Sequence, residues 1–415
     1  MTESRKVPKL RFPEFSGDWE QRKLGDVGST YTGLSGKTKV DFGHGKAKFV
    51  TYMNVFSNTV ASSMMIEPIE IDERQNKVLY GDVFFTTSSE TPEEVGMSSV
   101  WLENSDNTYL NSFCFGYRPK EHFDPYYLAY MLRSPSIRGK IVFLAQGISR
   151  YNISKNKMMD IEIPIPQIKE QNQIGLFFHN LDSTITLHQR KLETLKKVKK
   201  SFLQKMFPKN GEKIPEIRFP EFSGDWEQRK LGELGKCQSG VGFPSIEQGG
   251  KEGIPFFKVS DMNLEGNQFE LSTANNYVSY EQIQKKGWKP ITSLPAIFFA
   301  KVGAAVMLNR KRLCRKPFLL DNNTMAYILG PELNVEFSKQ LFEIIYLPSL
   351  AQEGALPSYN ASNVENLNVV ITQNENEQHK IGAFLQKIDK TITLHQRKLE
   401  VLNKLKKAML QNMFV

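Results

Sequence analysis

One fifteen-residue phrase occurs twice, without change, in this chain of 415 residues. The phrase RFPEFSGDWEQRKLG stands at residues 11–25 and again at 218–232. A second stretch, TITLHQRKLE, stands at 184–193 and returns at 391–400, with the same displacement of 207 positions. Two separate matches with one displacement indicate a duplicated unit. The sequence therefore predicts two tandem copies of one folding unit.

The residues between the repeats differ from one copy to the other. Runs such as KFVTYMNVF and PAIFFAKVGAAVML are rich in β-branched and aromatic residues and are bounded by Gly, Pro and Asn. That composition is typical of short strands. We therefore expect an α+β domain that is used twice, with a shared frame and a variable filling.

Both copies end in a stretch whose apolar residues recur with heptad spacing, which predicts long helices over about 170–207 and 376–414. The predicted pairing positions are Phe178, Leu181, Ile185, His188, Leu192 and Leu195 in the first helix and Leu385, Ile388, Ile392, His395, Leu399 and Leu402 in the second. A single stripe could pack on its own domain, but two matched stripes favour pairing with each other. We expect an antiparallel pair, with His188 and His395 facing each other and residues 1–18 near the end of the second helix.

The repeat also predicts the domain boundaries. We expect an N-terminal segment 1–18, a variable domain 19–150, a shared region 151–209, a linker 210–225, a second variable domain 226–357 and a second shared region 358–415. Domains of this size can each bury a core of their own.

The formal net charge of +9 favours a polyanionic partner such as nucleic acid. The segment NRKRLCRK at 309–316 lies between two strand-like runs and is predicted to be a basic hairpin tip, although a solvated turn would have the same composition. Glycine-bearing turns at 32–39 and 238–243 would allow a close backbone approach to a ligand, or serve only as tight turns. The predicted DNA-binding residues are Lys37, Lys39, Lys301, Arg310, Lys311, Arg312, Arg315 and Lys316.

No catalytic or metal-ligating constellation is found in the sequence. SGKTK at 35–39 would need glycine where Tyr31 stands to be a phosphate-binding loop, and the three cysteines lack the spacing of a zinc cluster. The chain has no apolar run long enough for a membrane span and no signal peptide at its start. We expect a cytoplasmic protein without a membrane partner, a metal or a cofactor of its own.

Taken together, the chain resembles the DNA specificity subunit of Type I restriction-modification enzymes over nearly its full length. The residues that carry the resemblance are WEQRKLGDV at 19–27, WEQRKLGEL at 226–234 and YNISKNKMMDIEIPIPQIKEQNQIG at 151–175. The second copy keeps YNAS at 359–362 and the pair Glu377 and Gln378. Counting back from Glu377, however, puts Gln373 opposite Pro166, so Asn374 is expected to cap the second helix instead.

The resemblance implies two target-recognition domains, each of which reads one half of an asymmetric bipartite site in double-stranded DNA. It implies two methyltransferase subunits that bind S-adenosylmethionine, and restriction subunits that use ATP and magnesium, as partners. Those partners would supply the site-specific deoxyribonuclease and adenine-N6 methyltransferase activities, and this chain would be non-catalytic. Two other classes remain open: a coiled-coil scaffold, which leaves the diverged domains unexplained, and a freestanding enzyme, for which no active site is found.

Overall fold

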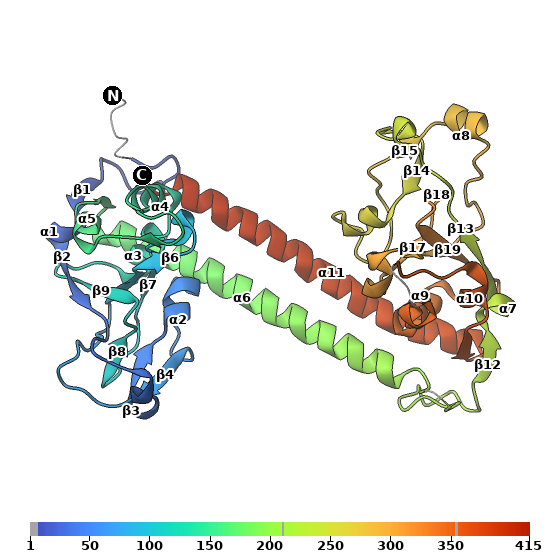
Figure 1. The fold of residues 1–415 in the computed structure, drawn as a ribbon, viewed down its shortest axis with the longest axis horizontal. Helices are drawn as coiled ribbons and strands as arrows, with labels where there is room; N and C mark the ends of the chain where they lie inside the picture. Colours follow the sequence, from blue (N-terminus) through green and yellow to red (C-terminus); the bar gives the residue numbers. More distant parts are fainter. Residues whose placement is uncertain (1–6, 210, 353–355) are drawn as a thin grey trace. The chain divides into compact units, whose positions relative to one another are not determined.

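The computed structural model describes residues 7–209, 211–352 and 356–415. The chain forms two compact units. Unit 1 contains Met1–Gln189 together with Arg397–Val415, and unit 2 contains Arg190–Gln396. Each unit holds one variable domain and a part of each of two long helices, α6 (Ile168–Lys205) and α11 (Glu375–Asn412) (Figure 1).

Unit 1 is built around a four-stranded antiparallel sheet in the order β2-β9-β5-β7. These strands are β2 (Gly28–Thr32), β5 (Val83–Thr86), β7 (Ser98–Val100) and β9 (Cys114–Pro119). A second sheet has the order β4-β3-β8, with β3 (Phe42–Val50), β4 (Ile66–Ile69) and β8 (Thr108–Leu110). In this sheet β3 pairs with β4 antiparallel and with β8 parallel.

Unit 2 repeats this topology with different residues. Its four-stranded sheet has the order β13-β19-β16-β17, with β13 (Gly235–Ser239), β16 (Ala296–Ala300), β17 (Lys311–Cys314) and β19 (Thr324–Leu329). Its second sheet, β15-β14-β18, contains β14 (Ile254–Phe257), β15 (Tyr277–Val278) and β18 (Leu319–Leu320), and again has one parallel pair. The prediction of one α+β domain used twice is confirmed.

The remaining short elements connect these sheets to the frame. In unit 1 they are α2 (Tyr52–Ser57), β6 (Ser88–Ser89), α3 (Pro125–Met131), α4 (Pro135–Phe143), β10 (Tyr151–Asn152) and α5 (Lys155–Met159), with 3-10 turns η1 (Lys39–Asp41) and η2 (Pro92–Glu94). In unit 2 they are α8 (Tyr280–Lys286), α9 (Val335–Ile344) and α10 (Ala361–Glu365), with η3 (Ser245–Glu247), η4 (Val259–Asn263), η5 (Ala304–Leu308) and η6 (Leu347–Leu350).

The repeated phrase forms the same strand and helical turn in both units. In unit 1 these are β1 (Glu20–Lys23) and α1 (Leu24–Val27), and in unit 2 they are β12 (Glu227–Lys230) and α7 (Leu231–Leu234). β1 pairs antiparallel with β11 (Glu162–Ile165), and β12 pairs in the same way with β20 (Asn368–Ile371). Burial of Trp19 and Trp226 beside these strands explains why the phrase folds alike twice.

The start of the second long helix confirms one expectation and corrects another. Asn374 caps α11, because its side-chain oxygen accepts hydrogen bonds from the backbone N–H groups of Asn376 and Glu377 at 3.0 and 3.2 Å. The position opposite Pro166, however, is Thr372 rather than Gln373. Its carbonyl accepts from Gln378 at 2.9 Å, as the Pro166 carbonyl accepts from Gln171 at 2.9 Å.

Sheet register gives the reason for this correction. Glu20 lies opposite Ile165, and Glu227 lies opposite Ile371, so the strands before the helices are displaced by 206 positions. The helices themselves are displaced by 207 positions at both ends. The second copy therefore has one extra residue between its strand and its helix, which counting back from the helix alone cannot detect.

The YNIS and YNAS stretches have similar sequences, but they do not occupy the same structural position in the two copies. Tyr151 and Asn152 form β10, and Ser154 occupies the N-cap of α5. In the second copy Asn360 is the N-cap of α10 and accepts a hydrogen bond from the backbone N–H of Asn363. The second stretch therefore begins its helix two residues earlier in the motif than the first.

The two long helices run antiparallel within each unit. In unit 1 Phe178 of α6 stacks on Phe414, just after α11, at a ring distance of 5.6 Å, and Asp182 pairs with Lys406 at 2.6 Å. In unit 2 Lys199 pairs with Asp389 at 2.7 Å, and Phe202 meets Phe384 at 4.9 Å. In both units a later residue of α6 meets an earlier residue of the second helix segment, so the predicted direction is confirmed.

Burial divides the predicted pairing positions into two groups. The buried positions are Phe178, Leu181, Ile185, Leu385, Ile392 and Leu399, and the half-buried positions are His188, Leu192, Leu195, Ile388, His395 and Leu402. The two histidines belong to different units, so their meeting stays a prediction. Within the described residues, no helix combines the length and the apolar character that a membrane span requires.

The described part of the N-terminal segment lies against the end of the last helix, as predicted. The backbone N–H of Leu10 donates to the carbonyl of Asn412 at 2.9 Å. In unit 2 the N–H of Ile217 donates to the carbonyl of Lys205 at 2.8 Å, and these residues are the counterparts of Leu10 and Asn412, 207 positions after the first and 207 before the second. Each unit therefore closes its frame by the same backbone hydrogen bond.

Candidate nucleic-acid interface

Four loop segments of unit 1, two of which include the paired short strands β6 and β10, meet at one end of its main sheet. They are residues 33–38, 87–90, 111–113 and 146–152, and we call them the loop end of unit 1. Backbone hydrogen bonds join them: Leu34 donates to Leu110 at 2.7 Å, Thr87 donates to Phe113 at 2.9 Å, and Ile153 donates to Thr87 at 3.0 Å. The sheet therefore positions four separate chain segments as one surface.

Unit 2 has the same loop end, made of residues 240–243, 301–303, 321–323 and the described residues of 352–358. Val241 donates to Leu320 at 2.9 Å, Lys301 donates to Asn323 at 2.9 Å, and Tyr359 donates to Lys301 at 3.2 Å. These bonds reproduce the three of unit 1. The side chains at matching positions differ, however, since Thr87 corresponds to Lys301 and Phe113 to Asn323.

A glycine allows the first loop of each set to pack closely. A Cβ atom on Gly33 would lie 2.2 Å from the Asn111 carbonyl oxygen, and one on Gly240 would lie 1.8 Å from the Asp321 carbonyl oxygen. Any side chain at either position would push the loop away from its neighbour. Both glycine-bearing turns that the sequence indicated lie at loop ends. In each turn the glycine lies close to a backbone carbonyl of its own unit.

Lys37 is held by an ion pair in the first loop of unit 1. Its ammonium nitrogen lies 3.0 Å from a carboxylate oxygen of Asp72, and only 12% of its side chain is exposed. Hydrogen bonds from Arg74, Lys37 and Gln75 hold the pKa of Asp72 well below its usual range. Lys39, at the start of η1, is exposed. Lys39 is therefore more accessible to a ligand than Lys37.

The basic segment 309–316 is not the hairpin tip that the sequence suggested. Residues Lys311–Cys314 form β17, an edge strand that pairs with β16. Lys311 is 6% exposed and donates to the carbonyl of Ile345 at 2.6 Å, and its burial lowers the pKa to about 8. Arg312 donates to the Asn267 carbonyl at 2.5 Å. Backbone carbonyls accept hydrogen bonds from both charged groups inside unit 2. The basic composition of a segment therefore does not show whether the segment forms a surface turn.

The other predicted basic residues lie in three kinds of surroundings. Arg310 donates to Asn263 at 2.5 Å, and Arg315 pairs with Glu270 at 3.3 Å and also with Glu336. Lys316 is exposed, and Lys301 is half-buried at the loop end of unit 2. The structure thus brings Lys37 and Lys301 to loop ends and leaves the segment 310–316 along β17. The DNA-binding role of all eight residues stays a prediction.

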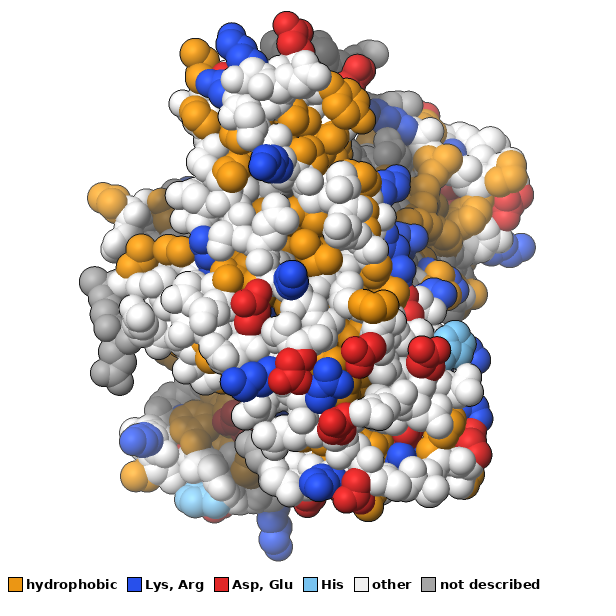
Figure 2. Space-filling model, turned by 90° about the vertical axis from the view of Figure 1, so that its right-hand side faces the viewer, with side chains coloured by type: hydrophobic (Ala, Val, Ile, Leu, Met, Phe, Trp, Pro, Cys, Tyr) orange, Lys and Arg blue, Asp and Glu red, His pale blue; other side chains and the backbone are white. Residues whose placement is uncertain are grey.

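Charged side chains of opposite sign are interspersed on the face shown in Figure 2. Ion pairs between exposed or half-buried side chains occur in unit 2 as well, since Arg229 lies 2.7 Å from Glu233 and 3.4 Å from Glu332. Contact with a polyanion on this face would depend on individual lysines and arginines rather than on one broad basic patch.

Three residues of the loop end of unit 1 were not predicted from the sequence. Arg150 donates to the hydroxyl of Ser88 at 3.2 Å, and its guanidinium lies 6.0 Å from the ring of Phe113. Phe113 and Ile148, which lies two positions before Arg150, are exposed. A sequence signal existed, because Leu-Ala-Gln at 144–146 returns at 350–352, but with a displacement of 206 rather than 207 positions.

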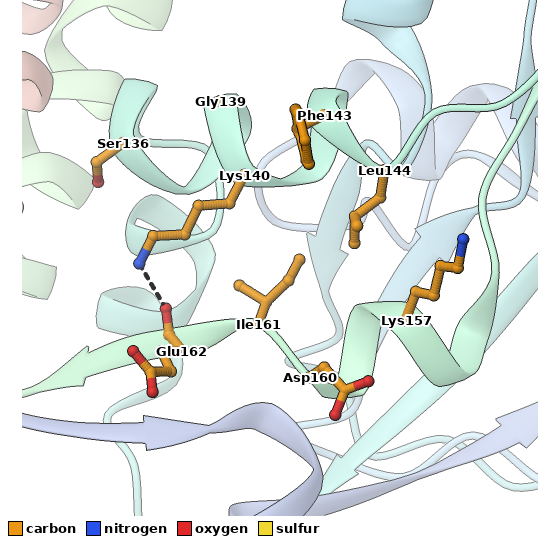
Figure 3. Close-up of a pocket in the computed structure, with 9 residues that line it drawn as sticks. All are labelled: Ser136, Gly139, Lys140, Phe143, Leu144, Lys157, Asp160, Ile161 and Glu162. Carbon is orange, nitrogen blue, oxygen red and sulfur yellow. Dashed lines mark hydrogen bonds between the residues drawn. The ribbon is translucent and has the colours of Figure 1, made fainter. Parts of the chain in front are cut away.

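Each unit also has a pocket beside its frame, and the linings of the two pockets correspond in part. The pocket of unit 1 has a volume of about 620 Å³ and is lined by Lys140, Phe143, Leu144, Lys157, Ile161 and Glu162. Figure 3 shows the Lys140 ammonium donating to the Glu162 carbonyl, at 2.8 Å, across this pocket. The pocket of unit 2, of about 510 Å³, has Tyr346, Ser349, Leu367 and Asn368 at the matching positions. The two pockets share these four positions and differ in the side chains there, whereas Phe207, Pro208, Lys209 and Gly211 line only the pocket of unit 2.

Two units with one framework and different loop residues define a class of protein that is built from a duplicated domain with a variable end. The family model described as the Type I restriction modification DNA specificity domain matches residues 16–197 and again 223–404. The chain belongs to this family and carries two copies of its domain. Among the described residues, no cluster of three or more His, Cys, Asp or Glu side chains has a metal-binding arrangement.

Individual relatives and solved structures are similar over most of the chain. The MjaVIII specificity subunit of Methanocaldococcus jannaschii is 22% identical over 97% of this chain and 92% of that protein. The MjaIX specificity subunit of the same organism is 22% identical over 99% and 94%. The putative MjaX specificity subunit, also from this organism, is 24% identical, but the match spans only 60% of this chain and 61% of that protein.

The solved structures support the fold. The crystal structure of the Type I restriction-modification S subunit from M. genitalium has a TM-score of 0.65 and 15% identity, and the match covers 99% of both chains. A chain from a structural study of assembly and conformational transition in the type I system has a TM-score of 0.53 and 18% identity, with 94% of this chain and 96% of that chain covered.

Proposed function

We propose that this chain is the DNA-binding specificity subunit of a Type I restriction-modification complex, in which each variable domain reads one half of an interrupted, asymmetric DNA site. One observation carries the proposal: both units hold four loops by the same hydrogen bonds and present different side chains on them. Because bases are read by side chains in the grooves, different loop residues select different half-sites. The shared frame then holds the readers of both half-sites, and the different side chains of the two loop ends determine which half-site each unit binds.

The repeated frame also supports two copies of one partner. Leu187 and Leu394, displaced by 207 positions on the long helices, are 65% and 49% exposed. Both leucines leave about half or more of their side chain accessible, and their repetition in both copies suits two identical docking surfaces. We infer that two methyltransferase subunits dock on the repeated helices, and that restriction subunits join the same complex.

Catalysis belongs to those partners in this proposal. The methyltransferase subunits bind S-adenosylmethionine and modify adenine at N6, and the restriction subunits use ATP and magnesium to cleave DNA, in the cytoplasm. The family assignment supports this division, since two specificity domains account for most of the chain. The contribution of this chain is to bind the DNA site and to position the partners on it.

Sequencing of modified bases in a host that expresses the complex tests the proposal. The expected result is one modified sequence made of two different parts separated by unspecified bases. A host without any modified sequence, or with one continuous short site, would contradict it. A salt titration of DNA binding distinguishes this proposal from the competing scaffold hypothesis. Contacts to phosphates weaken steeply with salt, whereas a protein scaffold shows no such dependence.

A further inference from the structure

The fourth loop segment of unit 1 holds one arginine at a fixed position. Gln146 and Asn152 exchange two backbone hydrogen bonds, at 3.0 and 2.8 Å, and so close the base of the segment. Asn152 also pairs with Ser88 of β6. Gly147 has a φ of 149°, and a Cβ atom there would lie 2.0 Å from the carbonyl oxygen of Arg150, so only glycine fits. The backbone that carries Arg150 is therefore held both by strand pairing and by its own loop.

Two neighbours restrain the exposed side chain of Arg150. One guanidinium nitrogen donates to the hydroxyl of Ser88 at 3.2 Å, and the guanidinium carbon lies 6.0 Å from the centre of the Phe113 ring. Phe113 is itself fixed, because its carbonyl accepts from the N–H and the hydroxyl of Thr87 at 2.9 and 2.8 Å. A guanidinium that is already held beside an aromatic ring loses less side-chain freedom when it binds a ligand.

Most of the hydrogen-bonding capacity of this guanidinium is still available. An arginine side chain has five N–H donors, and the bond to Ser88 uses one of them. Within the described part of unit 1, no carboxylate pairs with Arg150. The charge of Lys37 at the same loop end, by contrast, is paired with Asp72 at 3.0 Å. Arg150 is therefore an oriented cation with donors left for a ligand.

Unit 2 has different residues at all three of these positions. Its pairing of Val302 with Ser358 repeats the pairing of Ser88 with Asn152. Leu356 is displaced from Arg150 by 206 positions, as Gln352 is from Gln146. The corresponding sets are Ser88, Phe113 and Arg150 in unit 1 and Val302, Asn323 and Leu356 in unit 2. The second set contains no charge, so the two units differ in what this place on their loop ends can bind.

We propose that Arg150 reads a guanine in the half-site of unit 1, by donating two parallel hydrogen bonds to O6 and N7 of that base in the major groove. The inference rests on the proposed function. Guanine presents two acceptors on this edge, whereas adenine and thymine present one each and cytosine presents a donor. The planar fork of a guanidinium matches such a pair of acceptors. Leu356 has no donor in its side chain, so unit 2 does not read a guanine from the same position.

The experiment uses the full complex and duplexes that carry the site found by sequencing of modified bases. Each guanine of the site is replaced in turn by 7-deazaguanine, which lacks the N7 acceptor, or by hypoxanthine, which keeps both O6 and N7. For the wild-type complex, 7-deazaguanine at one guanine of one half-site should weaken binding by about tenfold, and hypoxanthine should not. Arg150→Ala should bind the unmodified duplex about tenfold more weakly and should no longer distinguish 7-deazaguanine from guanine there.

Two further measurements separate base reading from a phosphate contact and from a misfolded loop. Arg150→Lys keeps the charge without the planar fork, so it should lose the same discrimination. Discrimination among duplexes altered in the other half-site should remain as in the wild type in both variants, because unit 2 is unchanged. Selective loss at one guanine supports the inference.

The contrary outcomes are distinct from one another. An Arg150→Ala complex that remains sensitive to 7-deazaguanine at every guanine where the wild type is sensitive would overturn the inference. Arg150→Lys binding that equals the wild type on every duplex would show a contact with phosphate only and would also overturn it. A wild-type complex that modifies no sequence and binds no duplex would overturn the proposed function itself.

Discussion

Arg11 donates two hydrogen bonds to the carboxylate of Glu170, at 2.7 and 2.8 Å, and so ties the segment before β1 to the first turn of α6. Arg218 and Glu377 repeat the contact in unit 2 at 2.6 and 2.9 Å. The two carboxylates are 1% and 0% exposed. Each unit is therefore held together by one buried, charge-assisted pair between its frame segment and its long helix.

Removing the charge of Glu170 should destabilise unit 1. In Glu170→Gln the guanidinium of Arg11, which is only 14% exposed, loses its counter-charge, and we expect a loss of about 2–4 kcal/mol in the free energy of unfolding. Hydrogen exchange of unit 1 peptides measures it. Glu20→Gln, at an exposed carboxylate, is the control and should change stability by less than about 0.5 kcal/mol. Equal effects of the two variants would refute the role of the pair.

Asp389 should make unit 2 sensitive to acid. Burial raises its pKa, but the charges of Lys339 and Lys199, at 3.0 and 2.7 Å, outweigh burial and leave the pKa below its ordinary value. A carboxyl with a lower pKa in the folded state stabilises the fold above its unfolded value of about 3.9, and this stability is lost as pH falls through the folded pKa.

We therefore expect the unfolding free energy of unit 2 to fall as the pH drops below about 4, and this pH dependence to flatten in Asp389→Asn. Urea unfolding at a series of pH values, followed through unit 2 peptides, measures both. Asp182→Asn, followed through unit 1 peptides, is the matched control, because Asp182 pairs with Lys406 at 2.6 Å in the equivalent position of unit 1 but has a side chain that is 28% exposed. A pH dependence that survives unchanged in Asp389→Asn would count against this account.

The glycines at the loop ends give a test of modular reading. Gly33→Ala should displace residues 34–38 from the Asn111 carbonyl and weaken binding to DNA by about tenfold, since a displaced loop no longer aligns its contacts. Competition binding with duplexes altered in one half-site is the measurement. Gly33→Ala should lose discrimination in one half and Gly240→Ala in the other. Loss in both halves from a single variant would contradict independent loop ends.

The repeated helices should hold two methyltransferase subunits. Native mass spectrometry of the saturated complex is expected to find two per chain, and one per chain in Leu187→Glu, because a carboxylate in an apolar contact is costly to bury. Leu394→Glu should also leave one subunit. Ser183→Glu, at an exposed position of α6, serves as a control for added charge. A wild-type complex that stays at one subunit would contradict the two docking surfaces.

The features that depend on spacing could be predicted from the sequence. Both long helices, their direction and the cap at Asn374 follow from heptad spacing, the repeat and local capping chemistry. The extra residue before α11 could not be predicted in this way, because it shows only in the pairing of Glu227 with Ile371. A constant displacement in the sequence shows that the unit is duplicated. The register of the paired strands is needed to show which residues of the two copies are structurally equivalent.

The candidate site was less accessible to sequence reasoning. Lys311 belongs to a basic run, but the carbonyl of Ile345 that satisfies its ammonium group lies 34 positions away in the chain. Tertiary contacts of this kind decide whether a basic residue faces DNA or the interior. Arg150 and Ile148 were missed because their loop is recognisable only when Gln146 and Gln352 are seen to close the same base.

The central claim is that one frame holds two independent recognition domains, and exchange of one domain tests it most directly. Residues 26–150 are replaced by the corresponding domain of another family member, and modified bases are sequenced in a host that expresses the complex. We predict that one half of the modified sequence changes while the other half and its own modification remain. A change in both halves together, or an unchanged site, would contradict the account.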